Sequence, residues 1–216
     1  MKKKIRIITN KGFTLIELLV VIAIIGILST VVIASLNSAR TKGQEASIKS
    51  TLKNIIAQAE LAYDAPGDYS NVCTDAKILS MRTSIIATGA TVGCYKSTDN
   101  KRWAISARST NDITKSWTVD STGVSVWNSS DPSGGVNMDW NTAVTTCKAT
   151  GEKLPSMEQL ISFRTASGGL PYGFQNYYYW AGNTLDATTA YDAYMVEGTE
   201  DATVKTNTGP HVRCVR

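Results

Sequence analysis

The sequence predicts an α+β protein in which a long N-terminal α-helix packs on an antiparallel β-sheet, followed by a second, small α+β module. Three observations predict this. An apolar segment at residues 13–34 continues into a one-sided apolar pattern that reaches residue 63. Short alternating strand patterns occupy residues 102–127. A Ser-, Gly- and Pro-rich stretch at 128–135 is typical of a linker, and a new helical pattern begins after it. The expected domains are therefore residues 13–127 and 136–216.

The N-terminal apolar segment is long enough to cross a membrane. Residues 13–34 contain a single charged side chain, Glu17. As an α-helix they would extend roughly 33 Å, which covers the hydrocarbon core of a bilayer. Beyond them, apolar residues recur at helical spacing (Ile48, Leu52, Ile55, Ile56, Ala59 and Tyr63). We expect one helix over residues 13–63, ended by turn residues at 64–67. Its first half would cross the membrane, and its second half would pack on a folded head.

The charge of the chain is concentrated at its N-terminus. The net charge is +4, but residues 1–12 carry five basic side chains and no acidic one. Without them 17 basic residues face 18 acidic ones, so bulk charge gives no argument for nucleic-acid binding. The basic leader predicts an N-terminus that stays in the cytoplasm while the rest is exported. A basic run follows the apolar segment (Arg40, Lys42, Lys49 and Lys53) and is interpreted as a solvated face near anionic lipid rather than a DNA site.

The boundary between leader and apolar segment carries a specific motif. The sequence KGFTLIELLVVIAIIGIL at residues 11–28 resembles the N-terminus of type IV pilins and of type II secretion pseudopilins. The resemblance implies that a prepilin peptidase cuts between Gly12 and Phe13 and that the new amine of Phe13 is N-methylated. It also implies a helical filament of homologous subunits, in which Glu17 meets the N-terminal amine of a neighbour. The alternative is that Glu17 simply lies at the headgroup boundary of an anchor.

The resemblance leaves the kind of filament open. One reading is an extracellular type IV pilus, in which this chain is expected to be a minor subunit because a large appended module would crowd the surface. The other is the periplasmic pseudopilus of a type II secretion system. Either implies a single-pass inner-membrane protein with its N-terminus in the cytoplasm before assembly.

The middle of the chain fits the head of such a subunit. We expect a short helix at 76–82 and strands at 102–108, 116–120 and 124–127, the last two joined by a turn at 121–123. A long helix followed by an antiparallel meander resembles the pilin head.

The C-terminal module begins with two helical patterns. Trp140, Ala143 and Cys147 form a stripe that Gly151 closes. Ser156 precedes a second helix at 157–165, with Gln159 in the capping-box position (three residues after the cap). Short strands are expected at residues 177–181, 193–196 and 212–215.

This half resembles the C-type-lectin-like domains of bacterial surface adhesins. The resemblance is carried by the W-x2-A-x3-C stripe, by the LPS of residues 154–156, by Tyr179 and Trp180, and by the terminal VRCVR. It implies an adhesion module for a surface glycan or protein ligand. The sequence lacks the E-P-N and W-N-D calcium signatures of sugar-binding animal lectins, so calcium-dependent sugar binding is not expected. Because formylglycine-generating enzymes share the fold, an exported enzyme is the remote alternative, although we expect no enzymatic activity.

Cysteine and histidine usage limits the chemistry. Four cysteines allow three pairings, and the module boundaries favour Cys73–Cys94 and Cys147–Cys214. A single histidine, His211, argues against Ser-His-Asp hydrolases and multi-histidine metal sites, and we expect it to be exposed. No metal and no cofactor are expected.

An aromatic cluster near the C-terminus is the candidate ligand surface. Tyrosine and tryptophan supply large contact areas at low entropic cost. Because alternate residues of a strand face opposite sides, we expect Tyr178 and Trp180 in the core and Tyr177 and Tyr179 at the surface as ligand contacts. The alternative is that the whole cluster is core.

Overall fold

A computed structural model describes residues 14–63, 67–127, 137–169, 171 and 174–215. The chain divides into two compact units, residues 1–44 and 45–216. The predicted leader, the turn residues 64–66 and the predicted linker at 128–135 lie outside the described residues. The domain boundaries drawn from the sequence therefore stay predictions.

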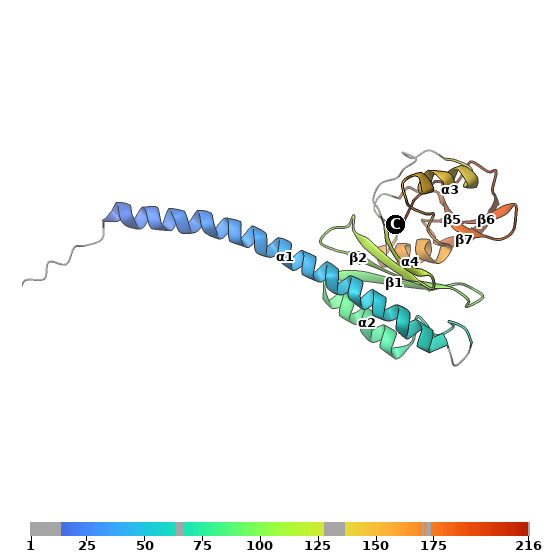
Figure 1. The fold of residues 1–216 in the computed structure, drawn as a ribbon, viewed down its shortest axis with the longest axis horizontal. Coiled ribbons are helices and arrows are strands. Elements are labelled where there is room, and N and C mark those ends of the chain that lie inside the picture. Colours follow the sequence, from blue (N-terminus) through green and yellow to red (C-terminus); the bar gives the residue numbers. More distant parts are fainter. Residues whose placement is uncertain (1–13, 64–66, 128–136, 170, 172–173, 216) are drawn as a thin grey trace, which may run out of the picture. The chain divides into compact units, whose positions relative to one another are not determined.

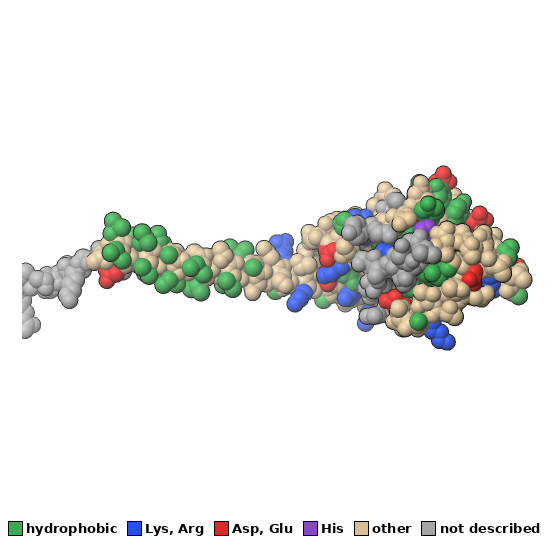
Figure 2. Space-filling model, turned by 90° about the horizontal axis from the view of Figure 1, so that it is seen from above, with side chains coloured by type: hydrophobic (Ala, Val, Ile, Leu, Met, Phe, Trp, Pro, Cys, Tyr) green, Lys and Arg blue, Asp and Glu red, His purple; other side chains and the backbone are tan. Residues whose placement is uncertain are grey.

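The long N-terminal helix is confirmed as α1, Leu15–Tyr63. In the first unit its apolar side chains are exposed all around, and Figure 2 shows hydrophobic groups along this part of the helix. Within the described part of the chain, α1 is the one helix long and apolar enough to cross a membrane. The helix continues through Gly26 and Gly43, where a Cβ atom would meet no neighbour within 4 Å.

The second unit begins with an antiparallel sheet, which we call sheet A. Its order is β1 (Ala90–Lys96), β2 (Trp103–Ser109), β3 (Ser116–Asp120) and β4 (Gly123–Trp127). The second half of α1 and helix α2 (Ala76–Ala87) cover one face of this sheet (Figure 1). The core between them is apolar and fully buried, and it includes Leu52, Ile55, Ile78, Ile85, Trp103, Ile105 and Val119. The apolar helical stripe and the alternating strands thus meet as the sequence predicted.

The C-terminal part contributes two helices and a second sheet. These are α3 (Trp140–Ala149), α4 (Met157–Ser167), and sheet B, formed by antiparallel β5 (Tyr178–Thr184), β6 (Thr189–Tyr194) and β7 (Thr199–Val204). Helix α4 packs on the face of sheet A opposite α1 and α2, and its other side packs on sheet B (Figure 1). The layers are therefore α1 and α2, sheet A, α4, and sheet B.

Helix α4 begins and ends as its sequence dictates. The Ser156 hydroxyl accepts from the Gln159 backbone N–H at 3.2 Å, and the Gln159 side chain accepts from the Ser156 backbone N–H at 2.9 Å. This is the predicted capping box. Gly168 ends the helix in the left-handed conformation, with φ 70°.

Both expected disulfides are present. Cys73 and Cys94 close a loop of sequence separation 21, with Cα atoms 5.8 Å apart. Cys147 of α3 and Cys214 near the C-terminus close a separation of 67, with Cα atoms 5.4 Å apart.

Several local predictions were wrong. Strands β1 and β7 were not predicted, and the expected strand at 193–196 is instead β6, which begins at Thr189 and ends at Tyr194. The expected strand at 212–215 is not a strand, because Val215 makes only an isolated bridge with Lys153. The short helix expected at 76–82 extends to Ala87. The α+β class and the antiparallel sheet are confirmed; the lectin-like resemblance of the C-terminal part is not tested.

Candidate functional site

The first functional segment is the start of α1. Thr14 precedes the helix, and its backbone N–H and hydroxyl both donate to Glu17 Oε2, at 2.8 and 2.7 Å. The Glu17 backbone N–H donates to Thr14 Oγ1 at 3.2 Å. These contacts form a capping box that holds the carboxylate at the helix N-terminus, where the macrodipole favours negative charge.

Glu17 is also chemically isolated among apolar side chains. Leu15, Ile16, Leu18 and Leu19 are all more than half exposed around it. On insertion scales a carboxylate costs roughly 2.5–3.5 kcal/mol at mid-membrane and less near an edge, where the first turn of α1 would lie, so its presence in this segment favours a specific role. Gly12 and Phe13 lie outside the described residues, and their roles as cleavage and methylation positions stay predictions.

The second feature is the structural junction between sheet A and α4, which the sequence did not reveal. Gly93, Ser106 and Thr118 are paired across β1, β2 and β3 and present a small, polar row toward α4. A Cβ atom at Gly93 would lie 2.1 Å from the Ser162 carbonyl oxygen and 2.4 Å from the Ala166 nitrogen. The glycine therefore allows the helix backbone to rest directly on the strand.

Hydrogen bonds join the two elements at this row. The Ser106 hydroxyl lies 2.7 Å from the Ser162 hydroxyl and 2.8 Å from the Thr118 hydroxyl. All three side chains are completely buried. Buried hydroxyls need partners, and here each is supplied by the opposing layer or the neighbouring strand.

One end of the junction is fixed by a glutamine and an aspartate. Gln159 Nε2 donates to Asp120 Oδ2 at 2.6 Å, and both side chains are buried. Asp120 Oδ1 accepts from the Thr122 and Gly123 backbone N–H groups in the turn between β3 and β4, at 2.7 and 2.8 Å.

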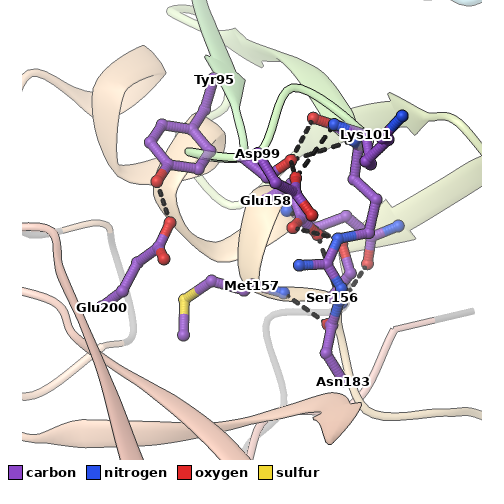
Figure 3. A network of polar contacts seen from close by, with 11 residues as sticks. Tyr95, Asp99, Lys101, Ser156, Met157, Glu158, Asn183 and Glu200 are labelled. Atoms are coloured by element: carbon purple, nitrogen blue, oxygen red, sulfur yellow. Dashed lines mark hydrogen bonds and ion pairs between the residues drawn. The ribbon is translucent and has the colours of Figure 1, made fainter. Parts of the chain in front are cut away.

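Polar contacts continue at the edge of the junction (Figure 3). Arg102 Nε lies 3.0 Å from Glu158 Oε1, and the carboxylate is only 2% exposed. Asn183 of β5 accepts from the Met157 backbone N–H at 2.9 Å. Figure 3 also shows the Tyr95 hydroxyl donating to Glu200, where partial loss of hydration raises the pKa of that carboxyl. Side chains of both sheets thus converge on α4.

The predicted ligand residues are divided differently from the expectation. Tyr177 is 49% exposed, as predicted, but Tyr179 is buried at 1% and belongs to the core under sheet B. Tyr178, expected in the core, is 39% exposed, while Trp180 is fully buried as expected. The reversal arises because Tyr179 and Ala181 face the α4 core, whereas Tyr178 is on the opposite face of β5.

His211 was expected to be exposed and is buried at 2%. Its ring stacks on Tyr177 with centroids 4.4 Å apart, and its backbone N–H and carbonyl pair with Tyr178 and Trp180. The histidine therefore supports the tyrosines from beneath.

Charged side chains line two of the cavities that open on the described surface of the second unit. The larger, about 500 Å³, lies between α3, residues 152–156 and the β3–β4 turn, and mixes Trp140 and Val144 with Lys148, Lys153 and Asp120. The smaller, about 310 Å³, lies on sheet B beside Tyr177 and Tyr178. Among the described residues, no group of three or more His, Cys, Asp or Glu side chains is placed to hold a metal ion.

The basic run beyond the apolar segment makes individual contacts. Lys49 lies 5.7 Å from the centroid of the Trp117 ring, on the head-packing part of α1. Nearby, Lys115 forms an ion pair with Glu45 at 2.7 Å.

Comparison with known families places residues 9–33 in the prokaryotic N-terminal methylation motif. The match covers the end of the leader, the predicted cleavage position, Glu17 and most of the apolar segment. It supports the type IV pilin and pseudopilin family and implies processing by a prepilin peptidase and assembly with other subunits. No curated protein matches the chain.

Proposed function

We propose that the chain is a minor structural subunit of a type IV pilus-like filament that displays its C-terminal half for adhesion. The observation that carries this is the methylation motif at residues 9–33 joined to a membrane-length helix with its carboxylate held at the N-terminus. In this proposal the leader stays in the cytoplasm, prepilin peptidase cuts after Gly12, and Phe13 becomes the methylated N-terminus.

Glu17 has a direct role in the proposed assembly. A carboxylate among lipid tails is stabilised when a positive charge comes close, and the amine of a neighbouring subunit supplies one. Subunit entry would then neutralise both charges as the apolar helices pack together. Residues 45–216 would remain outside the helical core and present sheet B.

The test is to shear filaments from the native cells and identify N-terminal peptides by mass spectrometry. The proposal expects a peptide that begins with methylated Phe13 in the sheared fraction, at low abundance relative to the main subunit. Glu17→Gln is expected to be processed normally and to be lost from filaments, whereas Glu60→Gln, on the head part of α1, is the matched control.

The second candidate is the pseudopilus of a type II secretion system, which the same motif favours equally. It expects processed protein in the envelope fraction, no sheared filaments, and a secretion defect on deletion. If residues 1–12 remain attached in mature cells, both candidates are wrong and the chain is a membrane-anchored surface domain.

We also propose that the C-terminal half is a binding module without enzymatic activity. The two disulfides engage all four cysteines, which removes a thiol nucleophile from this half. Intact-mass measurement with and without reductant tests this directly, and a reduced Cys147 or Cys214 in mature protein would contradict it.

A further inference from the structure

The smaller cavity combines features that point to a cationic ligand. It has a volume of about 310 Å³, and its lining includes Tyr177, Tyr178, Asp192, Asp201, Thr203 and Asn207. Among the described residues that line it, two are acidic and none is Lys or Arg. The cavity thus has aromatic walls and negative charge, and it is far larger than the roughly 30 Å³ that one water occupies in the liquid.

Asp192 is the chemically unusual residue. It is 2% exposed, and the Thr203 hydroxyl lies 3.2 and 3.1 Å from its two carboxylate oxygens. A single neutral hydroxyl compensates poorly for the lost hydration of a carboxylate. Burial, with the nearby charge of Asp201, raises the pKa of Asp192 to about 6. At neutral pH the group is mainly ionised, and a positive charge beside it would be stabilising.

The neighbouring strand doubles the negative charge. Asp192 of β6 pairs directly with Asp201 of β7, so both side chains lie on the same face of sheet B. Like charges placed directly opposite each other repel, and this arrangement is destabilising in the absence of a cation. Two carboxylates are too few ligands for Ca²⁺, which takes six to eight oxygens, so the geometry favours an organic cation.

The tyrosines are held in place before any ligand arrives. Tyr177 stacks on buried His211, and Tyr178 stacks on Tyr194 with ring centroids 4.9 Å apart. The Tyr194 hydroxyl donates to Asn176 at 2.7 Å, which fixes that second ring. Rigid, half-exposed aromatic rings can line an aliphatic chain and attract a cation through their faces.

We propose that this cavity binds the side chain of a lysine on a protein ligand, with the alkyl stem against Tyr177 and Tyr178 and the ammonium group between Asp192 and Asp201. A primary ammonium group is a compact charge with three donors, which suits two carboxylates that face each other. The four-carbon stem accounts for the aromatic wall, which a small inorganic cation would leave unused. The proposal deepens the adhesion role proposed above, but the binding itself does not depend on filament assembly.

The test is calorimetric titration of the full processed chain in detergent with N-acetyl-lysine methylamide. We expect binding that is lost with the Nε-acetylated form of the same probe, which keeps the stem and removes the charge. Asp192→Asn and Tyr178→Ala are each expected to weaken binding at least 10-fold. Asp186→Asn, an exposed aspartate in the β5–β6 turn outside this cavity, is the matched control and is expected to bind as wild type does.

The remaining outcomes each decide against the proposal. Binding of glucosamine in place of the lysine probe would assign the cavity to an amino sugar. Equal binding of the acetylated and unmodified probes, or no binding by a folded wild-type chain, would remove the ammonium site. Melting curves of Asp192→Asn keep a folding defect separate from lost binding. Filament assays on the same variant test the proposed function independently, since the cavity lies outside the N-terminal motif.

Discussion

Gln159 and Asp120 connect two elements that are far apart in the sequence. The Gln159 amide donates to Asp120 Oδ2 at 2.6 Å, while its carbonyl oxygen completes the capping box with Ser156. Asp120 in turn orders the turn after β3 through its other oxygen. One glutamine thus caps the start of α4 and also attaches the helix to sheet A. Changes at Gln159 or Asp120 are therefore expected to affect both the helix and the sheet.

Glutamine 159 therefore makes a sensitive test of the junction. Gln159→Glu keeps the oxygen that accepts from the Ser156 backbone N–H, but it places a second carboxylate against that of Asp120. We expect the free energy of unfolding to fall by about 2 kcal/mol at pH 7. The loss should shrink as the pH approaches 4, where the introduced carboxyl takes up a proton. Adding Asp120→Asn restores a donor–acceptor pair and is expected to recover most of the stability in denaturant titrations. A double variant no better than Gln159→Glu would contradict the pairing.

Gly93 is expected to tolerate no side chain. Gly93→Ala places a methyl group against the α4 backbone, which cannot rotate away, and overpacking of this kind costs roughly 1–3 kcal/mol. The matched control is Gly43→Ala in α1, where a Cβ meets nothing within 4 Å and helix propensity favours alanine by about 1 kcal/mol. Thermal melting of both variants should show opposite signs. Equal melting temperatures would mean that α4 does not rest on β1 as described.

The two disulfides are expected to stabilise the second unit, residues 45–216, unequally. From loop length alone, Cys147–Cys214, with its separation of 67, should contribute about 4 kcal/mol and Cys73–Cys94, with 21, about 3 kcal/mol. Denaturant unfolding of the two double Cys→Ser variants, one for each bridge and both without reductant, measures the contribution of each disulfide to the free energy of unfolding. A larger loss for the short loop would show that strain or denatured-state structure outweighs loop closure.

Asp192 is expected to lower stability at neutral pH. Because its folded pKa, about 6, lies above the unfolded value, the native state binds the extra proton between about pH 4 and 6. Stability therefore falls as the pH rises through that window. Asp192→Asn should raise the free energy of unfolding by roughly 1–2 kcal/mol at pH 7 and change it little at pH 4. The expected gain is smaller than the pKa difference alone implies, because solvent in the open cavity screens the charge. Asp186→Asn should show no such pH-dependent gain.

Thr14 is expected to matter through Glu17. Thr14→Val removes the hydroxyl that donates to the carboxylate and weakens the helix cap by roughly 1 kcal/mol, whereas Thr14→Ser retains both functions. We expect normal cleavage in both variants, several-fold fewer sheared filaments containing Thr14→Val, and near wild-type incorporation of Thr14→Ser. Equal incorporation of the two would show that Glu17 needs no help from Thr14.

The sequence was most informative where a local rule acts alone. The period of α1, the capping box at Ser156 and strand β3 were predicted because helix spacing, cap chemistry and alternation are local. The junction was not predicted, because alternating polar residues on strands usually mark a solvent face. Here Ser106 and Thr118 are polar yet buried, since α4 covers them and its Ser162 hydroxyl pairs with that of Ser106.

The candidate ligand surface failed for a related reason. The predicted alternation of exposed and buried residues on β5 was wrong. Tyr179 and Ala181 are buried in the core with α4, and Trp180 on the other face is buried against α3, so the strand is covered on both faces there. Which tyrosine is buried depends on where the two helices lie, and the strand alone carries no such information. Gly93 would have signalled a close backbone approach only if strand β1 had been predicted, and it was not. Asp192 could not be singled out, because strand β7, which carries Asp201 opposite it, was not predicted.

The small, polar face of sheet A has a consequence for how the chain matures. Residues 90–127 precede residues 157–167 in the chain, so a sheet that forms as the chain emerges lacks its covering helix for a time on the order of seconds. An apolar face would promote aggregation with other unfolded chains during that delay. A face made of Gly93, Ser106 and Thr118 remains hydrated instead. The partly folded protein therefore stays soluble until α4 packs on sheet A and displaces the water.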